Sequence, residues 1–357
     1  MKKIGILTGG GDCPGLNAVI RAVVRKSSKN SWVTVGIKNG WKGLIEGDMI
    51  PLTNQQVSGI LTKGGTILGT SRTNPFKNQD DVNKMLENIK KFNIDVIVAI
   101  GGDDTLNVAL KLHQMRVPVV GVPKTIDNDI SCTDYTFGFD TAVAIVTEAI
   151  DRLHTTAESH HRVMILEVMG RHTGWIATMA GIAGGADQIL IPEKPFDVDE
   201  VCDSIKARYN KGKTFSIVVV AEGAKPKDTE TYITQSQEVD EFGHVKLGGI
   251  GHFLENEIKK RLPVEVRVTV LGHVQRGGTP TAYDRILATR FGIAAVELIE
   301  NNKYGMMVAL QGNKIVPVPL ESAVSVSKTV DMDLYRIAEV FFEHEPKSTV
   351  ISLDNKQ

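Results

Sequence analysis

Two adjacent carboxylates follow a glycine pair in AIGGDDTLN, residues 99–107. Glycines at a strand end let backbone amides approach a phosphate, yet the carboxylates of Asp103 and Asp104 would repel that phosphate. Mg²⁺ reconciles the two features, because it prefers carboxylate and water oxygens and bridges to phosphate. Asp104 alone could instead be the N-cap of a helix that begins near Thr105. For the pair after two glycines, we favour a metal role for Asp103.

A second glycine-rich turn lies in TGGGDCPGLNAVIRAVVR, residues 8–25, where a strand leads into a helix that opens near Pro14. Free backbone amides and the positive helix end favour an anion there. A dinucleotide is disfavoured, because the spacing is not GxGxxG and the next strand ends in GIKNG with no acid for a ribose hydroxyl. Such a turn can also serve only to pack a helix on a sheet, and we favour phosphate binding over that alternative.

A cluster of charged residues follows another apolar strand in GVPKTIDNDI, residues 121–130. A carboxylate at a strand end, such as Asp127, can be a general base, and a neighbouring cation such as Lys124 can stabilise charge on a transferred group. Asp-Asn-Asp is also ordinary turn chemistry. This motif alone leaves both interpretations open.

Cations gather near strand ends in VMGRHTGW, residues 168–175, and TVLGHVQRGG, residues 269–278. The guanidinium fork matches phosphate oxygens. Single arginines are usually solvated, but several of them near the ends of strands in one sheet system predict phosphate binding. The residues concerned are Arg171, His273 and Arg276, with Arg162 and Arg267 at the start of the strands that precede these motifs.

Short apolar runs alternate with amphipathic stretches, which predicts an α/β fold built from βαβ units. The expected strands are 3–8, 32–37, 94–100, 117–122, 162–168, 188–192, 215–221 and 265–271. The expected helices are 14–28, 78–92, 104–115, 139–158, 173–184, 197–211, 250–261 and 280–300. Because the second half repeats the strand, glycine and helix theme, we expect two similar Rossmann-like lobes with largely parallel sheets and an active-site cleft between them. The polar segment 225–249 should be an exposed excursion or a small hairpin.

Composition sets limits on partners and location. The chain has 357 residues, 42% of them hydrophobic, and a net charge of -1, which offers no footprint for nucleic acid or an anionic membrane. Three cysteines without CxxC spacing argue against a disulfide framework and a structural zinc. No apolar run approaches membrane-spanning length, and the N-terminus enters a strand at once, which leaves no room for a signal peptide. We expect a cytoplasmic protein.

In this order and spacing, GGDCPGLNAVIR, GGDDTL, PKTIDND, EVMGRHTGW and LGHVQRGG resemble the phosphofructokinase family, which phosphorylates the 1-hydroxyl of fructose 6-phosphate. The resemblance runs from residue 3 to roughly residue 300. It implies that residues 1–138 plus about 275–325 form a phosphoryl-donor lobe. Residues 139–274 plus about 326–357 would form a sugar-phosphate lobe.

The resemblance also assigns roles. Gly11 would contact the phosphoryl donor, Asp103 would be linked to magnesium, and Asp127 would be the general base. Arg162 and Arg267 would reach in from a neighbouring subunit, so a homodimer or homotetramer with shared active sites is expected. The implied sugar-phosphate ligands are Thr125, Asp127, Met169, Gly170, Arg171, Glu222, His273 and Arg276.

The donor is the point at which branches of the family differ. Its ATP-using members have glycine at the position of Asp104, and commonly at that of Lys124 as well. Opposite charges fill both positions here, which resembles the pyrophosphate-dependent branch. Asp104 would repel the α-phosphate of ATP, and Lys124 would neutralise charge on the phosphate transferred or released. We therefore expect Asp104, Lys124, Asp127 and Arg171 to be catalytic.

These inferences predict reversible, Mg²⁺-assisted phosphoryl transfer from pyrophosphate to fructose 6-phosphate. An ATP-dependent 6-phosphofructokinase is the nearest alternative. An alternative of another class is a non-catalytic regulatory protein that binds sugar phosphate. Such a protein should lack Asp103 or Asp127, and both are present.

Overall fold

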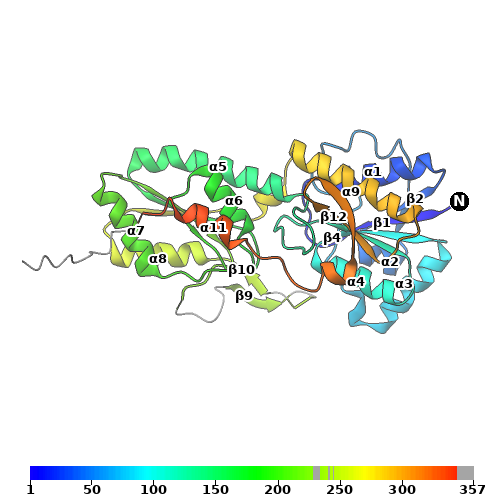
Figure 1. Ribbon diagram of the computed structural model, residues 1–357. Coiled ribbons are helices and arrows are strands. Elements are labelled where there is room, and N and C mark those ends of the chain that lie inside the picture. Colours follow the sequence, from blue (N-terminus) through cyan, green and yellow to red (C-terminus); the bar gives the residue numbers. More distant parts are fainter. Residues whose placement is uncertain (228–233, 240–241, 244, 344–357) are drawn as a thin grey trace, which may run out of the picture.

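The computed structural model describes residues 1–227, 234–239, 242–243 and 245–343 (Figure 1). Two α/β lobes lie side by side, and the chain passes between them more than once. The expected fold class is confirmed, although the lobes differ in size. No helix among the described residues is long and apolar enough to cross a membrane.

The first lobe contains a seven-stranded sheet in the order β13-β12-β5-β4-β1-β2-β3. All neighbours pair in parallel except β3 and β13 at the two edges. The strands are β1 (Lys3–Thr8), β2 (Val33–Ile37), β3 (Met49–Leu52), β4 (Val96–Gly101), β5 (Val119–Pro123), β12 (Met306–Gln311) and β13 (Lys314–Pro319). The helices are α1 (Leu16–Lys29), α2 (Trp41–Glu46), a 3-10 turn η1 (Pro75–Lys77), α3 (Gln79–Lys91), α4 (Asp103–Gln114), α9 (Ala282–Glu300) and α10 (Leu320–Ala323).

Helices cover both faces of this sheet, so its central strands are apolar on both sides. Every residue of β4 is buried. Val96, Val98 and Ile100 join the apolar cluster on one face, while Ile97 and Ala99 join the cluster on the other. Alternate side chains of a strand point to opposite faces, so a continuous run of apolar residues is what a doubly covered strand requires.

The second lobe contains a four-stranded, fully parallel sheet in the order β11-β6-β8-β7. Its strands are β6 (Val163–Val168), β7 (Gln188–Leu190), β8 (Ser216–Ala221) and β11 (Val266–Val270). Its helices are α5 (Phe139–His160), α6 (Trp175–Gly184), α7 (Val198–Asn210), α8 (Ile250–Arg261), a 3-10 turn η2 (Gly272–Arg276) and α11 (Met332–Glu339). A separate hairpin joins β9 (Thr234–Val239) to β10 (Val245–Leu247).

Each expected strand and helix is present, with its ends within two residues of the expected ones. The described part of 225–249 contains the β9–β10 hairpin, one of the two structures expected there. The sequence did not predict the edge strands β3 and β13, nor β12, which lies beside β13. Pro317 and Pro319 in β13 argue against a strand, but an edge strand tolerates proline because one side needs no ladder hydrogen bond. The lobe boundaries near 138, 275 and 325 stay a prediction.

Candidate active site

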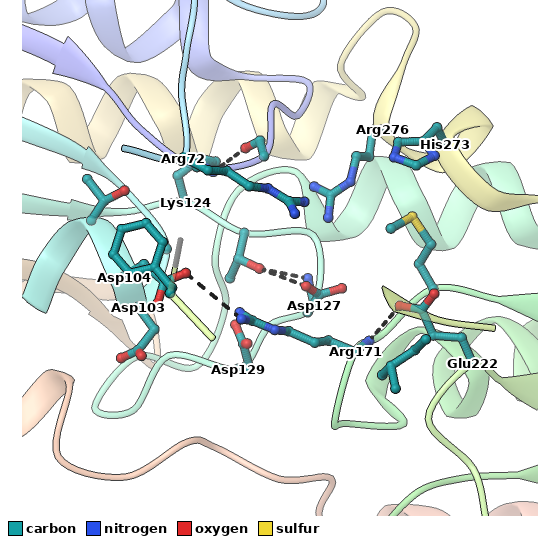
Figure 2. Close-up of a pocket in the computed structure, with 18 of the residues that line it drawn as sticks. Arg72, Asp103, Asp104, Lys124, Asp127, Asp129, Arg171, Glu222, His273 and Arg276 are labelled. Atoms are coloured by element: carbon teal, nitrogen blue, oxygen red, sulfur yellow. Dashed lines mark hydrogen bonds and ion pairs between the residues drawn. The ribbon is translucent and has the colours of Figure 1, made fainter. Parts of the chain in front are cut away.

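A cavity of about 720 Å³ lies between the lobes, at the carboxyl ends of β1, β4 and β5 on one side and of β6, β8 and β11 on the other (Figure 2). Ligands of open α/β sheets bind at such strand ends. Most of the expected site residues line it: Gly11, Asp103, Asp104, Lys124, Thr125, Asp127, Met169, Arg171, Glu222, His273 and Arg276. Gly170 lies between two of them in the chain.

Close packing explains the glycines of the first lobe. A Cβ at Gly9 would lie 2.5 Å from Oγ1 of Thr105, and one at Gly101 would meet the same side chain. A Cβ at Gly11 would lie 2.5 Å from Nη1 of Arg276, which also donates to the Asp12 carbonyl at 3.2 Å. Arg276 from the other side of the cavity therefore rests on the glycine loop, and a larger residue at position 11 would displace it.

The two adjacent acids occupy the first turn of α4, after β4. The N-cap is Gly102, so the alternative in which Asp104 caps a helix from Thr105 is wrong. Both carboxylates lie where the positive end of the helix dipole favours negative charge. Asp103 Oδ1 accepts a hydrogen bond from Asn107 at 3.1 Å.

Asp104 is the acid that reaches across the cavity. Its Oδ2 lies 3.9 Å from Nη2 of Arg171, in the second lobe (Figure 2). The two groups form an ion pair that joins the two lobes across the cavity. An anion bound at this point would meet the Asp104 carboxylate directly.

Lys124 follows β5, and its backbone amide donates to the Gly101 carbonyl at 2.9 Å. Its side chain is buried, and Nζ donates to the Gly11 carbonyl. Burial lowers the pKa of this ammonium from its ordinary value, while the charge of Asp127 opposes that shift. A buried cation thus lies between the glycine loop and the 124–129 turn, where a phosphate held by that loop would contact it.

Asp127 and Asp129 both line the cavity, with the left-handed residue Asn128 (φ 52°) between them. The Asp127 amide donates to Thr125 Oγ1 at 3.0 Å, and that hydroxyl lies 3.4 Å from Asp127 Oδ2. Within the described residues, Oδ1 of each aspartate is buried without a hydrogen-bond partner. Burial, followed by the charge of Asp127, raises the pKa of Asp129 to about 6.

This arrangement of acids fits a hard cation bound together with phosphates. Asp103, the acid expected to hold the cation, lines the cavity together with Asp104, Asp127 and Asp129. No cluster of three His, Cys, Asp or Glu side chains in the described part of the chain could hold a metal by itself. Mg²⁺ needs no such cage, because it keeps several waters and commonly takes one or two carboxylates plus substrate phosphates.

The second lobe contributes Arg171 from the turn after β6. Arg171 has a left-handed backbone (φ 55°), and its amide donates to Glu222 Oε1 at 3.1 Å. A Cβ at Gly170, whose φ is 151°, would strike the Thr173 carbonyl, so this turn requires glycine there. Burial, followed by the charge of Asp127, raises the pKa of Glu222 to about 7. Glu222 therefore changes charge near neutral pH.

Met169 and the η2 turn complete this side of the cavity. The Met169 amide donates to Gln275 Oε1 at 3.2 Å, and the Gln275 side chain is fully buried. This bond fixes η2 against the end of β6, which brings His273 and Arg276 to the cavity wall. Sequence reasoning missed Gln275, because its role is to bond a backbone amide and glutamine in a turn gives no signal of that.

Arg162 and Arg267 do not line the cavity. Arg162 lies one residue before β6 and donates from Nε to Glu265 Oε2 at 2.7 Å. Arg267, in β11, pairs with the same carboxylate. Both arginines lie near the amino-terminal ends of their strands, opposite to the ends that form the cavity. Within one chain they belong to a different surface.

Several cavity residues were not assigned by the sequence. Ser71, Arg72 and Thr73 come from the irregular segment before η1, and Arg72 points into the cavity from the same side as Lys124 (Figure 2). No strand or glycine signature precedes that segment, so only the fold brings it there. Glu167 was missed because it lies inside the apolar strand β6, one residue before its end. Its carboxylate accepts from the Gly251 amide at 2.8 Å, at the start of α8.

Comparisons with known proteins agree with this geometry. The sequence pattern of the family described as Phosphofructokinase matches residues 3–299. The pyrophosphate--fructose 6-phosphate 1-phosphotransferase of Streptomyces coelicolor is 56% identical over 342 residues, 95% of this chain and 99% of that protein. The ATP-dependent 6-phosphofructokinase of Mycobacterium bovis is 53% identical over the same shares.

The solved pyrophosphate-dependent phosphofructokinase of Marinobacter aquaeolei superposes with a TM-score of 0.81 at 22% identity, over 97% of this chain and 93% of that one. At this identity the likeness supports the two-lobe fold alone. The family match and the near full-length relatives carry the rest. With the cavity they describe a phosphotransferase, and this chain belongs to the phosphofructokinase family.

Proposed function

We propose that this chain transfers a phosphoryl group reversibly from pyrophosphate to the 1-hydroxyl of fructose 6-phosphate, giving fructose 1,6-bisphosphate and phosphate. The observation that carries the choice of donor is the ion pair of Asp104 with Arg171 at 3.9 Å, inside the cavity. ATP would have to place its α-phosphate and nucleoside beyond the two phosphates that react. Pyrophosphate has no such further groups, so it would not have to pass the Asp104 carboxylate.

Asp104 would therefore act by exclusion. A carboxylate set against an additional phosphate costs several kcal/mol in a poorly hydrated site. Its pairing with Arg171 also holds that guanidinium at the donor, where it would contact the transferred phosphoryl group. The same pair thus supports one donor and disfavours the other.

Lys124 would stabilise the phosphate that leaves. Its ammonium is buried beside the Gly11 carbonyl and Asp127, so it contacts the donor site without being screened by water. Phosphoryl transfer passes through a largely dissociative transition state, in which charge builds up on the departing group. A fixed cation at this position acts mainly on the rate rather than on binding.

Asp127 would take the proton from the sugar hydroxyl. Its Oδ1 has no hydrogen-bond partner among the described residues, while the Thr125 hydroxyl donates to Oδ2 at 3.4 Å. Mg²⁺, when bound, would neutralise charge on the phosphate oxygens, and Asp103 would be the residue to hold it. The sugar-phosphate ligands would be Arg171, Glu222, His273, Arg276 and their neighbours in the second lobe.

The sugar-phosphate site would need a second subunit. Arg162 and Arg267 lie outside the cavity of their own chain, as residues that serve a neighbour's site would. We therefore propose a homodimer or homotetramer with shared active sites. We also place the enzyme in the cytoplasm, and its three free thiols support a reducing compartment.

The alternative donor, ATP, is favoured by the names of several mycobacterial relatives that are 53–54% identical to this chain. Run in reverse, the reaction separates the two donors. Fructose 1,6-bisphosphate and Mg²⁺ are incubated with labelled inorganic phosphate or with ADP. The proposal predicts labelled pyrophosphate and no ATP, whereas ATP made from ADP without labelled pyrophosphate would overturn it. If neither forms while sugar phosphate still binds, the chain is a regulatory paralogue.

A further inference from the structure

A short strap, residues 327–330, crosses from α10 in the first lobe to α11 in the second (Figure 1). On the first side, the Lys328 amide donates to the Asp129 carbonyl at 2.9 Å, and Ser327 forms an antiparallel bridge with Ile130. On the second side, the Trp175 indole donates to the Lys328 carbonyl at 3.2 Å. The strap therefore touches both the Asp127–Asp129 turn and the first residue of α6.

The Lys328 side chain points into the first lobe. Its ammonium donates to Asn128 Oδ1 at 3.0 Å, to the Thr133 carbonyl at 2.8 Å and to the Asp134 carbonyl at 2.9 Å. It also lies 5.2 Å from the centre of the Trp175 ring. Three acceptors match the three hydrogens of an ammonium, so the group is satisfied only while it is charged.

Asn128 is the residue that needs this support. It adopts a left-handed backbone (φ 52°) between the two cavity acids, a conformation that persists only where the surroundings hold it. Besides Lys328, its Oδ1 accepts from the Thr136 amide at 3.1 Å, and its Nδ2 donates to the Asp134 carbonyl at 3.3 Å. This reversal of the backbone is what lets Asp127 and Asp129 both line the cavity while Asn128 turns away.

We propose that Lys328 is a positioning residue for phosphoryl transfer: by holding Asn128 in its left-handed turn, it keeps the Asp127 carboxylate aimed at the substrate. Through Trp175 the same residue ties this turn to α6, which begins just after the Arg171 turn. The proposal rests on the proposed role of Asp127 as base, but not on which donor is used. Lys328 touches no reacting atom and acts through Asn128.

The protonation of Lys328 gives a readout that a merely structural contact lacks. Burial lowers the pKa of its ammonium to about 8, and the facing carboxylates of Asp134 and Asp129 oppose that shift. Above that pH the neutral amine has only two hydrogens for three acceptors. Turnover should therefore fall as pH rises through about 8, and arginine at this position should remove that fall because its charge persists.

The test compares Lys328→Met, Lys328→Arg and a matched control, Lys194→Met. Lys194 pairs with Glu339 and lies over the Tyr335 ring, both in α11. Among the described residues it forms no hydrogen bond or ion pair with residues 127–134. Turnover and KM for fructose 6-phosphate are measured from pH 6.5 to 9.5, in steps of about half a unit, with whichever donor the wild type uses. Hydrogen exchange at the Thr136 and Asp127 amides is followed in the same proteins.

The expected result is a loss of kcat of roughly 10- to 100-fold in Lys328→Met, with KM little changed, because a misplacement of about 1 Å can cost about 100-fold. Lys328→Arg should recover most of this loss. Its turnover should no longer fall as pH rises through about 8, as the turnover of the wild type does. Faster exchange at Thr136 and Asp127 is expected in Lys328→Met alone.

Equal losses in Lys328→Met and Lys194→Met, or unchanged exchange at these amides, would overturn the proposal. If Lys328→Met does not fold, Lys328→Arg provides the test. The proposal is then overturned if the turnover of Lys328→Arg falls above about pH 8 as that of the wild type does. Failure of the proposed function is recognised separately. In that case Asp127→Asn keeps its activity, or neither donor is used, while the exchange data still report whether Lys328 holds the turn.

Discussion

The two halves of the cavity are built differently. In the donor half, three turns of one lobe are bonded to one another: the Lys124 amide binds the Gly101 carbonyl at 2.9 Å, and the Gly9 amide binds the Ile100 carbonyl at 2.9 Å. In the sugar half, Val270 and Val274 beside His273 are 44% and 65% exposed, and two expected cations lie elsewhere. One chain completes the donor half. We propose that a second subunit completes the sugar half.

The two halves of the cavity also differ in their charged residues. Acids dominate the donor half, with Asp103 and Asp104 on α4 and Asp127 and Asp129 after β5, and Lys124 is buried among them. The sugar half contains Arg171, His273 and Arg276 together with Glu167 and Glu222, and Arg72 lies on the donor side. A half rich in acids suits a phosphate that arrives with a cation, and a half rich in guanidinium suits a phosphate that is bound directly.

The largest effect is expected at Asp127, where the donor half meets the sugar half. Asp127→Asn should lower kcat by about 10²- to 10⁴-fold, because it removes the general base. KM for fructose 6-phosphate should change far less. Steady-state kinetics measure both, with Asp48→Asn on the exposed surface of the same lobe as control. A variant with nearly native kcat would show that the base is another group.

Hybrid oligomers test the incompleteness of the sugar half. Arg162→Ala and Asp127→Asn should each be nearly inactive alone, because each lacks one part of every site. After controlled subunit exchange, a hybrid would contain a site with both native residues and regain activity. Exchange of Asp127→Asn with the Arg162→Ala, Asp127→Asn double variant is the control and should regain none. Verified hybrids without activity would place the whole site in one chain.

Donor preference should respond to the donor half alone. Asp104→Gly should raise the affinity for ATP, because it removes a like-charge contact worth several kcal/mol in a poorly hydrated site. Lys124→Gly should lower kcat with pyrophosphate more than it weakens binding. Asp80→Gly, in the first turn of α3, matches the loss of a first-turn acid and should leave the preference unchanged. Unimproved ATP binding in Asp104→Gly would remove our explanation of the preference.

The smallest effect concerns the buried carboxyl of the sugar half. Glu222 has a pKa of about 7 in the folded chain against an ordinary value of 4.5, so its ionised form destabilises folding. This penalty develops as pH rises from about 4.5 to about 7 and then stays constant, at on the order of 3 kcal/mol. Glu222→Gln removes it, so its melting temperature relative to wild type should rise across that window and then level off.

Calorimetry at several pH values measures this difference. Glu87→Gln on the exposed face of α3 is the control and should show no such rise. A constant difference between Glu222→Gln and wild type from pH 4.5 to 8 would mean that Glu222 ionises at its ordinary pKa, and that burial does not govern this half of the cavity.

The sequence predicted the donor half of the cavity better than it predicted the irregular segments that only the fold brings into place. The strands and helices with long periodic patterns were predicted, and so were the glycine turns and acids of the donor half, because each motif directly follows a buried strand. Arg72 and Lys328 were not assigned. They belong to irregular segments whose positions are set by contacts with residues far away in the chain: Thr70 bonds Gly10, 60 residues away, and Lys328 bonds Asn128, 200 residues away. Local patterns contain no trace of such contacts.

The central claim, that the donor half admits pyrophosphate and excludes ATP, is tested most directly by one comparison. We would measure kcat/KM of the unmodified chain for the two donors, at saturating fructose 6-phosphate and the same free Mg²⁺. The account predicts turnover with pyrophosphate and a value lower by about two orders of magnitude or more with ATP, since a like-charge contact costs several kcal/mol. Rapid turnover with ATP and none with pyrophosphate would contradict it.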